Sequence, residues 1–297
     1  MRRAFVSVLA FVSLQAAVRA GAQPHELIGI RAQGMAGAFV AVADDATATW
    51  WNPAGLPNTL FSAVAEVDKG DGFGFALSIP QFGVSFYRTP VNQIQRLDST
   101  ASLAPGRQDL GAAGIGLSSS IDQFGATIGQ SFGEHVVVAT TLKLMHARSE
   151  SAGDLDVGAL ARFGALRLGV SARNLAAPTF GETDPLHVPR RVRAGVALSG
   201  RGRGSVNELT LSLDVDVTSA TSGEDRRGIS GGAEAWLLDH RLGVRGGAGG
   251  DLERSEAFGA GGVSVAVRKG MFVDAAITRG GAGEFGDRWG VDFRVSF

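Results

Sequence analysis

Residues 209–218 read Leu-Thr-Leu-Ser-Leu-Asp-Val-Asp-Val-Thr, in which apolar and polar side chains alternate without a break. Successive side chains of a β-strand point to opposite faces, so this stretch predicts a strand with one apolar and one polar face. Apolar residues rarely recur at helical spacing after Leu60, which favours an all-β protein. The same alternation recurs in residues 136–145, 154–163, 166–173, 191–198 and 263–268.

Segments of about ten alternating residues, joined by Gly, Asp and Asn turns, are typical of transmembrane β-barrels, because a bilayer requires every backbone group to pair within the wall. The chain holds about 14 or 15 such segments, and the even strand number of single-chain bacterial barrels favours 14. An exported soluble sandwich or propeller also has alternating strands, but its outer face is the polar one.

The last ten residues favour the barrel. Trp289, Val291, Phe293, Val295 and Phe297 form an unbroken apolar face, and the sequence stops at Phe297. This segment resembles the terminal strand of outer-membrane barrels, whose last residue is typically phenylalanine and which the barrel-assembly machinery recognises. The resemblance implies an assembly signal at Trp289, Phe293 and Phe297 and a place in the lipid of the bacterial outer membrane. With one tyrosine and four tryptophans, the chain must draw most of its interfacial aromatic residues from its 17 phenylalanines.

The first 22 residues are predicted to be a cleavable signal peptide. Arg2 and Arg3 precede an apolar run from Ala4 to about Leu14, and Ala20-Gly21-Ala22 supplies the small residues of a cleavage site. A membrane anchor is the alternative, but a run of about 11 residues is too short for the ~20 that span a bilayer. The exported chain is expected to begin at Gln23.

If the apolar faces contact lipid, the charged residues between them point into the barrel, because an arginine facing the middle of the bilayer costs about 2–4 kcal/mol. Both signs occur, so ion pairs are expected across the lumen; these charges either solvate a wet interior or line a substrate path. Other inward positions are small, among them Gly195, Gly243 and Gly247, which leaves space inside. The predicted luminal charges are Asp154, Asp156, Arg162, Arg167, Arg173, Arg191, Arg193, Asp214, Asp216, Glu234, Arg241, Arg245, Asp274, Asp292 and Arg294.

Composition excludes several other classes of protein. Without cysteine there is no disulfide framework or thiolate nucleophile, and a net charge of −1 argues against nucleic-acid binding. The five histidines have no metal-ligand spacing, and neither a nucleophile elbow nor a phosphate-binding loop is present, so neither a metal site nor a cofactor is predicted and the chain is not expected to be an enzyme. The pair Asp44-Asp45 is expected to cap a helical turn rather than hold a metal.

Residues 29–56 read GIRAQGMAGAFVAVADDATATWWNPAGL. This block resembles the N-terminal signature of the FadL superfamily of outer-membrane barrels, and especially its shorter PorV/PorQ-type members, with Ala36 in place of a usual glycine. In FadL-type proteins this segment forms a small hatch inside the barrel. The resemblance therefore implies a hatch over residues 23–59 and a barrel over residues 60–297.

The residues of this segment agree with a hatch. Gly34 and Gly37 allow the backbone to approach a wall closely, Asn52-Pro53 favours a turn, and Asn52 is a candidate anchor to the luminal charges. Phe39, Trp50 and Trp51 would be poorly placed in an empty aqueous lumen. A periplasmic tail or an extra strand is the alternative for this segment.

Two functions follow from the resemblance. FadL similarity implies passive transport of hydrophobic small molecules of the fatty-acid or aromatic-hydrocarbon type, which bind beside the hatch and leave through a gap in the wall. Gly72, Gly74 and Pro80 mark either such a gap or, for Pro80, an ordinary turn. PorV similarity implies instead a barrel associated with type IX secretion that binds secretion-system or cargo proteins. A general diffusion pore is disfavoured by the hatch.

Overall fold

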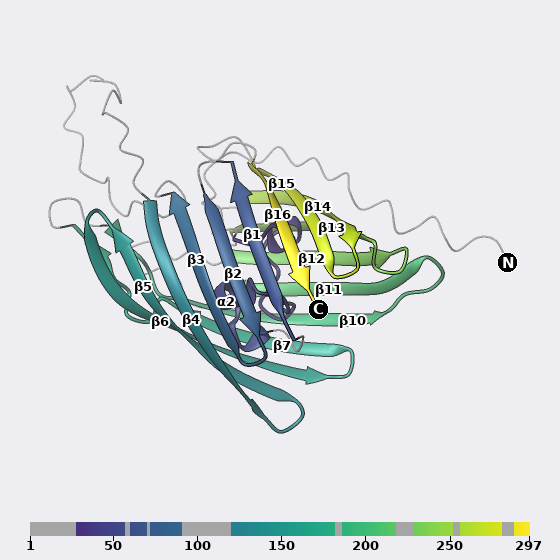
Figure 1. Cartoon of the computed structure of the whole chain (residues 1–297), viewed down its shortest axis with the longest axis horizontal. Coiled ribbons are helices and arrows are strands. Elements are labelled where there is room, and N and C mark those ends of the chain that lie inside the picture. Colours follow the sequence, from purple (N-terminus) through teal and green to yellow (C-terminus); the bar gives the residue numbers. More distant parts are fainter. Residues whose placement is uncertain are drawn as a thin grey trace, which may run out of the picture.

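The computed structural model describes residues 28–56, 60–69, 72–90, 120–181, 186–217, 228–251, 256–280 and 288–297. Fourteen antiparallel strands form a closed barrel, in which β1 pairs with β2 on one side and with β16 on the other (Figure 1). This confirms the predicted all-β barrel and its strand number. The expected signal peptide and cleavage site lie outside the described residues.

The barrel strands are β1 (Ser62–Asp68), β2 (Phe73–Ile79), β3 (Phe82–Pro90), β4 (Ser120–Phe132), β5 (Val136–Ala147), β6 (Glu150–Phe163), β7 (Leu166–Arg173), β10 (Arg191–Arg201), β11 (Val206–Asp216), β12 (Gly228–Leu237), β13 (Leu242–Asp251), β14 (Glu256–Arg268), β15 (Met271–Gly280) and β16 (Arg288–Ser296). A two-stranded sheet of β8 (Thr179–Phe180) and β9 (Leu186–His187) lies in the connection between β7 and β10. The helices are α1 (Ile30–Gly34), α2 (Ala48–Trp51) and the 3₁₀ turn η1 (Pro53–Gly55). None of the helices within the described ranges is long and apolar enough to cross a membrane.

The apolar face of each strand lies on the outside of the barrel. Leu209, Leu211 and Leu213 on β11 are 44–50% exposed. Asp214 and Asp216, on the opposite face of the same strand, are buried. A soluble sandwich would bury the leucines and expose the aspartates. An apolar belt of this size is stable only against lipid, which confirms the predicted orientation of the strands.

The two ends of the barrel differ in their connections. Short turns join β2 to β3, β4 to β5, β6 to β7, β10 to β11, β12 to β13 and β14 to β15, and we call this the short-turn end. The opposite, long-loop end carries the other connections, including the segment between β7 and β10. In barrels of the bacterial outer membrane, short turns face the periplasm and longer loops face outward.

Residues 28–56 lie inside the ring of strands, where Figure 1 shows them as the purple coils. Every described residue of this segment except Asp44 is buried. Its contacts are with side chains and backbone on the inner face of the barrel, as described below. We call it the N-terminal segment.

The structure does not place a gap in the wall at Gly72, Gly74 or Pro80. Pro80 lies in the tight turn between β2 and β3, and the ladders of β2 with both neighbours run without a register shift over residues 73–79. Gly74 leaves room for the Tyr87 ring, whose Cδ1 would lie 2.5 Å from an added Cβ. Of the two interpretations of Pro80, the strand pairing therefore favours the turn, and no gap is seen at Gly74. Gly72 lies in the β1–β2 connection, where its N–H donates to Asp68.

Candidate functional site

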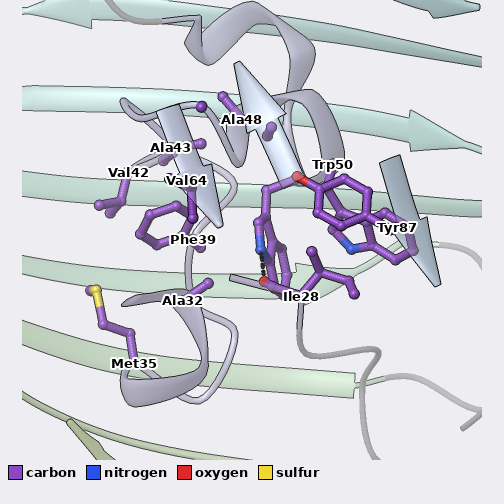
Figure 2. Packing of buried hydrophobic residues seen from close by; sticks show 14 of the residues in the cluster. Ile28, Ala32, Met35, Phe39, Val42, Ala43, Ala48, Trp50, Val64 and Tyr87 are labelled. Carbon is purple, nitrogen blue, oxygen red and sulfur yellow. Dashed lines mark hydrogen bonds between the residues drawn. The ribbon is translucent and has the colours of Figure 1, made fainter. Parts of the chain in front are cut away.

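The core of the N-terminal segment is aromatic. Trp50 packs edge-on against Tyr87 of β3 at 5.2 Å between ring centroids (Figure 2). Phe39 packs against Trp51 at 6.2 Å between ring centroids. The Trp51 indole N–H donates to the carbonyl of Ile28 at 2.6 Å. These rings bury one another inside the barrel, so they are not exposed to water as they would be in an empty lumen.

Arg31 on α1 joins the segment to the wall. Its Nε and Nη2 donate to the two carboxylate oxygens of Glu234 on β12 at 2.8 and 2.6 Å, the paired geometry that suits a guanidinium. Its Nη1 pairs with Asp44 and also donates to Asp45 at 3.2 Å. Arg167 on β7 reaches Asp44 from the opposite side at 3.2 Å.

The same network continues along the inner wall beyond Glu234. Arg245 on β13 donates from Nε to Glu234 at 2.8 Å and contacts Asp274 on β15 at 3.3 Å. Arg294 on β16 donates to the other Asp274 oxygen at 3.0 Å. Arg31 therefore enters a row of alternating charges that spans β12 to β16, and each buried charge has an opposite charge beside it, as burial requires.

Charge pairing also sets the pKa of the two network members that lie outside the strands. Burial alone would lower the pKa of Arg31, but Asp44, Glu234 and Asp45 outweigh it and raise that pKa well above its ordinary value. Burial would raise the pKa of Asp44, but Arg31 and Arg167 outweigh it and lower that pKa. Both groups are therefore charged in the folded barrel.

Glycines on the inner wall let the segment's backbone approach closely. A Cβ at Gly247 would lie 2.5 Å from the Met35 carbonyl carbon, and one at Gly232 would lie 2.7 Å from the Met35 oxygen. Gly34 faces Gly262 in the same way, because a Cβ added to Gly34 would lie 3.2 Å from the Cα of Gly262. The inward glycines of β12, β13 and β14 therefore form a bare surface that fits residues 34–36.

Two further anchors fix the middle and the end of the segment. The Asp214 carboxylate accepts the backbone N–H groups of Phe39 and Val40 at 2.7 and 2.8 Å. Asn52 donates to the carbonyls of Val40 and Ala159 at 2.9 and 3.1 Å, so it binds backbone rather than the luminal charges expected from the sequence. Before α2, the Asp45 carboxylate accepts the backbone N–H of Thr47 at 2.9 Å, in addition to its contact with Arg31. Its neighbour Asp44 forms ion pairs with Arg31 and Arg167.

A second buried charge cluster lies on the other side of the lumen. The Lys143 ammonium on β5 contacts Asp154 and Asp156 on β6 at 2.7 Å each and donates to Asn174 at 2.6 Å. Asp156 and Asp154 also accept the backbone N–H groups of Asn174 and Ala176. We call these residues the Lys143 cage; it fixes the root of the β7–β10 connection to the wall.

The β7–β10 connection folds onto the inner wall near the long-loop end. Phe180 and Leu186 of the β8–β9 sheet are buried in an apolar cluster with inward-facing Ile121 and Met145. Val188, Ala147 and Ala152 complete the cluster. Phe180, Leu186, Ile121, Met145 and Val188 are at most 3% exposed, so this cluster is packed interior that fastens the connection to the wall.

A cavity of about 810 Å³ opens at the short-turn end of the lumen. Trp236 on β12 and Phe272 on β15 form its aromatic wall, with ring centroids 5.4 Å apart, and Arg294 lies over the Phe272 ring at 4.5 Å. Arg31 and Asp44 of the N-terminal segment line the cavity from within. The segment thus separates this aromatic surface from the long-loop side of the lumen.

The structure brings together most of the residues predicted to face the lumen. Arg241 differs, because it lies in the exposed turn between β12 and β13. Arg162, Arg167 and Arg191 are half-buried. The predicted luminal charges that are buried are Asp154, Asp156, Arg173, Arg193, Asp214, Asp216, Glu234, Arg245, Asp274, Asp292 and Arg294.

Sequence reasoning missed three central residues: Arg31, Lys143 and Asn174. Arg31 is the one charged residue between Ile28 and Ala43, and that isolation in an apolar run was its available signal. Lys143 lies on the polar face of its strand, where it could have been grouped with the luminal charges. Nothing in the sequence marks Asn174 as its partner.

No protein family model matches the chain, and no curated protein matches it. Solved structures do match over nearly the whole barrel. The toluene transporter TbuX of Ralstonia pickettii has a TM-score of 0.64 at 11% identity, covering 91% of this chain and 98% of that chain. The CymD monoaromatic hydrocarbon channel has a TM-score of 0.61 at 11% identity, covering 91% and 97%.

The fold is that of the hydrocarbon channels. A third such structure, the toluene transporter TodX of Pseudomonas putida, has a TM-score of 0.54 at 11% identity and covers 93% of this chain and 99% of that chain. This similarity confirms the barrel fold that the resemblance of residues 29–56 implied. The PorV/PorQ-type assignment is not confirmed.

Proposed function

We propose that this protein is an outer-membrane barrel for the passive passage of hydrophobic small molecules, of the aromatic-hydrocarbon or fatty-acid type. The apolar belt supports a membrane location, and the structural neighbours, described as toluene transporters and a monoaromatic hydrocarbon channel, support the ligand class. Export through a signal peptide and recognition of Trp289, Phe293 and Phe297 by the assembly machinery belong to the same proposal. The role is not enzymatic.

The observation that carries this proposal is the aromatic cavity at the short-turn end. Trp236 and Phe272 form its wall, and Arg31 and Asp44 of the N-terminal segment line it from within. Apolar ligands partition onto such a surface at about 0.8 kcal/mol per buried CH₂. A ligand can therefore bind beside the N-terminal segment, which interrupts the path from the long-loop side.

In this proposal the N-terminal segment acts as a hatch. Apart from the backbone that continues into β1, it is attached to the wall by ion pairs and hydrogen bonds and not by strand pairing, so it can shift without opening the barrel. Ligand passes when residues 28–56 move away from part of the inner wall. Because the ladders around Gly74 and Pro80 are continuous, the cavity at the short-turn end, and not a gap at those residues, is the proposed exit.

The alternatives named above have less support. A secretion-associated barrel depends on the PorV/PorQ assignment, which the structural neighbours do not support. A general diffusion pore requires a wide aqueous path, whereas the N-terminal segment occupies the lumen.

Uptake by reconstituted barrels tests the proposal. Vesicles whose outer leaflet contains lipopolysaccharide should accumulate labelled toluene or labelled fatty acid faster with the protein than without it. Phe272→Ala, which removes part of the aromatic wall, should slow uptake, and Val273→Ala, on the outer face of the same strand, should not. Protein-containing and protein-free vesicles with equal uptake and no bound ligand would contradict the proposal.

A further inference from the structure

The short-turn end of β10–β15 carries five exposed cations that have no partner among the described residues. Arg201 ends β10 and Arg203 lies in the β10–β11 turn, Arg241 closes the β12–β13 turn, Arg268 ends β14, and Lys269 begins the β14–β15 turn at the mouth of the cavity. Within the described part of the chain, the side chains of these five residues make no ion pair or hydrogen bond. They form what we call the basic rim.

The carboxylates of the basic rim are engaged with other groups. Glu208 lies 3.8 Å from His240, and Asp239 accepts from the Asn207 amide at 3.5 Å. Arg201 lies opposite Glu208 in the β10–β11 ladder without forming an ion pair, and neither of these two side-chain carboxylates pairs with any of the five cations. The five cations outnumber the two side-chain carboxylates, which leaves positive charge for an outside partner.

The long-loop end shows the opposite arrangement. Its exposed cations in the described residues are Lys69, Arg190 and Arg279, and each of them, like the half-buried Arg148, has a partner. Arg190, for example, donates to the carbonyl of Leu175 at 2.8 Å. Among the described residues, unpaired exposed cations therefore lie at the short-turn end of the barrel and not at the long-loop end.

The basic rim lies at the edge of the apolar belt. Val267, the residue before Arg268, is 68% exposed, and Leu238 in the β12–β13 turn is 57% exposed. Exposed apolar side chains beside the turns place these turns at the boundary between acyl chains and headgroups. Lysine and arginine at such a boundary extend their charges toward the headgroups.

The other half of the short-turn end uses aromatic residues at the same level. Phe82 begins β3, Phe132 ends β4 and Phe163 ends β6, and all three are exposed on the belt. This agrees with the expectation that phenylalanine supplies the interfacial aromatic residues. Around the rim, rings therefore mark the interface on β3–β7 and cations mark it on β10–β15.

We propose that the basic rim is a binding surface for anionic phospholipid headgroups in the membrane leaflet at the short-turn end. The inference rests on the membrane location proposed above and does not depend on the transported ligand. Clustered Lys and Arg beside a membrane surface select anionic over zwitterionic lipid, and the selection weakens with salt. The preference should be local to β10–β15, because the β3–β7 half offers rings and no exposed cation in its described turns.

Native mass spectrometry of the full-length barrel, released from micelles with added phosphatidylglycerol or phosphatidylcholine, tests this proposal. The wild type should retain phosphatidylglycerol in preference to phosphatidylcholine, and added salt in the micelle solution should reduce the difference. The variant R203Q/R241Q/K269Q removes one cation from each turn and should lower the preference about tenfold or more. The matched control K69Q/R148Q/R279Q removes three cations from the long-loop end and should leave it unchanged.

Two results would overturn the inference. One is equal retention of phosphatidylglycerol and phosphatidylcholine by the wild type, whether or not the rim binds a soluble acidic peptide. The other is an equal loss of preference in the long-loop control. Heat-modifiable migration in gels shows whether each variant is a folded barrel, and uptake of labelled toluene by the same preparations separates a failure here from a failure of the transport proposal.

Discussion

Arg31 and Lys143 are both buried cations held by two or more acidic side chains, yet they attach different parts of the chain in different ways. Lys143 and its partners Asp154 and Asp156 have almost no exposed side-chain surface. In the Arg31 network, by contrast, the Asp44 side chain is 32% exposed and lines the cavity at the short-turn end. Water reaches the attachment of the N-terminal segment and does not reach the Lys143 cage. We therefore expect the segment to be released more readily than the β7–β10 connection.

The largest effect is expected in the Lys143 cage. Lys143→Met leaves Asp154 and Asp156 buried without their cation, which should lower the free energy of unfolding by about 3–5 kcal/mol. Urea unfolding in lipid vesicles, followed by tryptophan fluorescence, measures the loss. The triple variant K143M/D154N/D156N should recover part of it, because no uncompensated charge remains; a neutral effect of Lys143→Met alone would show that the cage does not stabilise the barrel.

Glu234→Gln should release the N-terminal segment while the barrel stays closed. Glu234 is the shared partner of Arg31 and Arg245, so its neutralisation weakens charged hydrogen bonds worth about 2–3 kcal/mol. Hydrogen exchange should accelerate in residues 30–45 and not in the strands. Glu208→Gln, on the neighbouring strand and lining the same cavity, is the control. Faster exchange throughout the strands would mean that the network supports the wall and not the segment.

A smaller loss is expected at the glycine surface. Gly247→Ala puts a methyl group into the Met35 backbone and should cost about 1–2 kcal/mol of segment attachment. Gly246→Ala points outward into open space and should be neutral. The rate of proteolysis within residues 28–56 compares the two variants, and equal rates would contradict the fit of segment to wall.

The smallest effect is expected when the pH is lowered. The pKa of Asp44 is lowered in the folded state, so its contribution to stability is fully present above its ordinary value of 3.8 and is lost as the pH falls through the lower folded value. Segment protection against proteolysis should fall in that range, and Asp44→Asn should weaken it at all pH values and remove this step. A wild type and an Asp44→Asn variant with the same pH profile would exclude Asp44 as the titrating group.

The barrel could be predicted from the sequence because alternation is a local property. Leu209–Val217 shows its two faces in the residues themselves, and the cost of a charge in lipid decides which face points outward. The N-terminal segment was predicted through its family resemblance, and Gly34 proved to lie against the wall as its lack of a side chain suggested.

The contacts inside the lumen could not be predicted, because they join residues far apart in the chain. Arg31 and Glu234 are 203 positions apart, and their meeting depends on the stagger of all the strands between them. The Lys143 cage depends on a connection that returns to the inner wall, which alternation does not encode. Pro80 could be assigned to a turn or to a gap by its chemistry alone, and only the strand pairing decides for the turn.

A disulfide lock tests most directly whether the N-terminal segment controls passage. The chain has no cysteine, and a Cβ at Gly232 lies 2.9 Å from the Cβ of Met35, so Met35→Cys with Gly232→Cys can form a bridge after a small shift. Uptake of labelled toluene should stop in the oxidised variant and return on reduction, with each single variant unaffected by oxidant. Equal uptake in the oxidised and reduced forms would contradict the account.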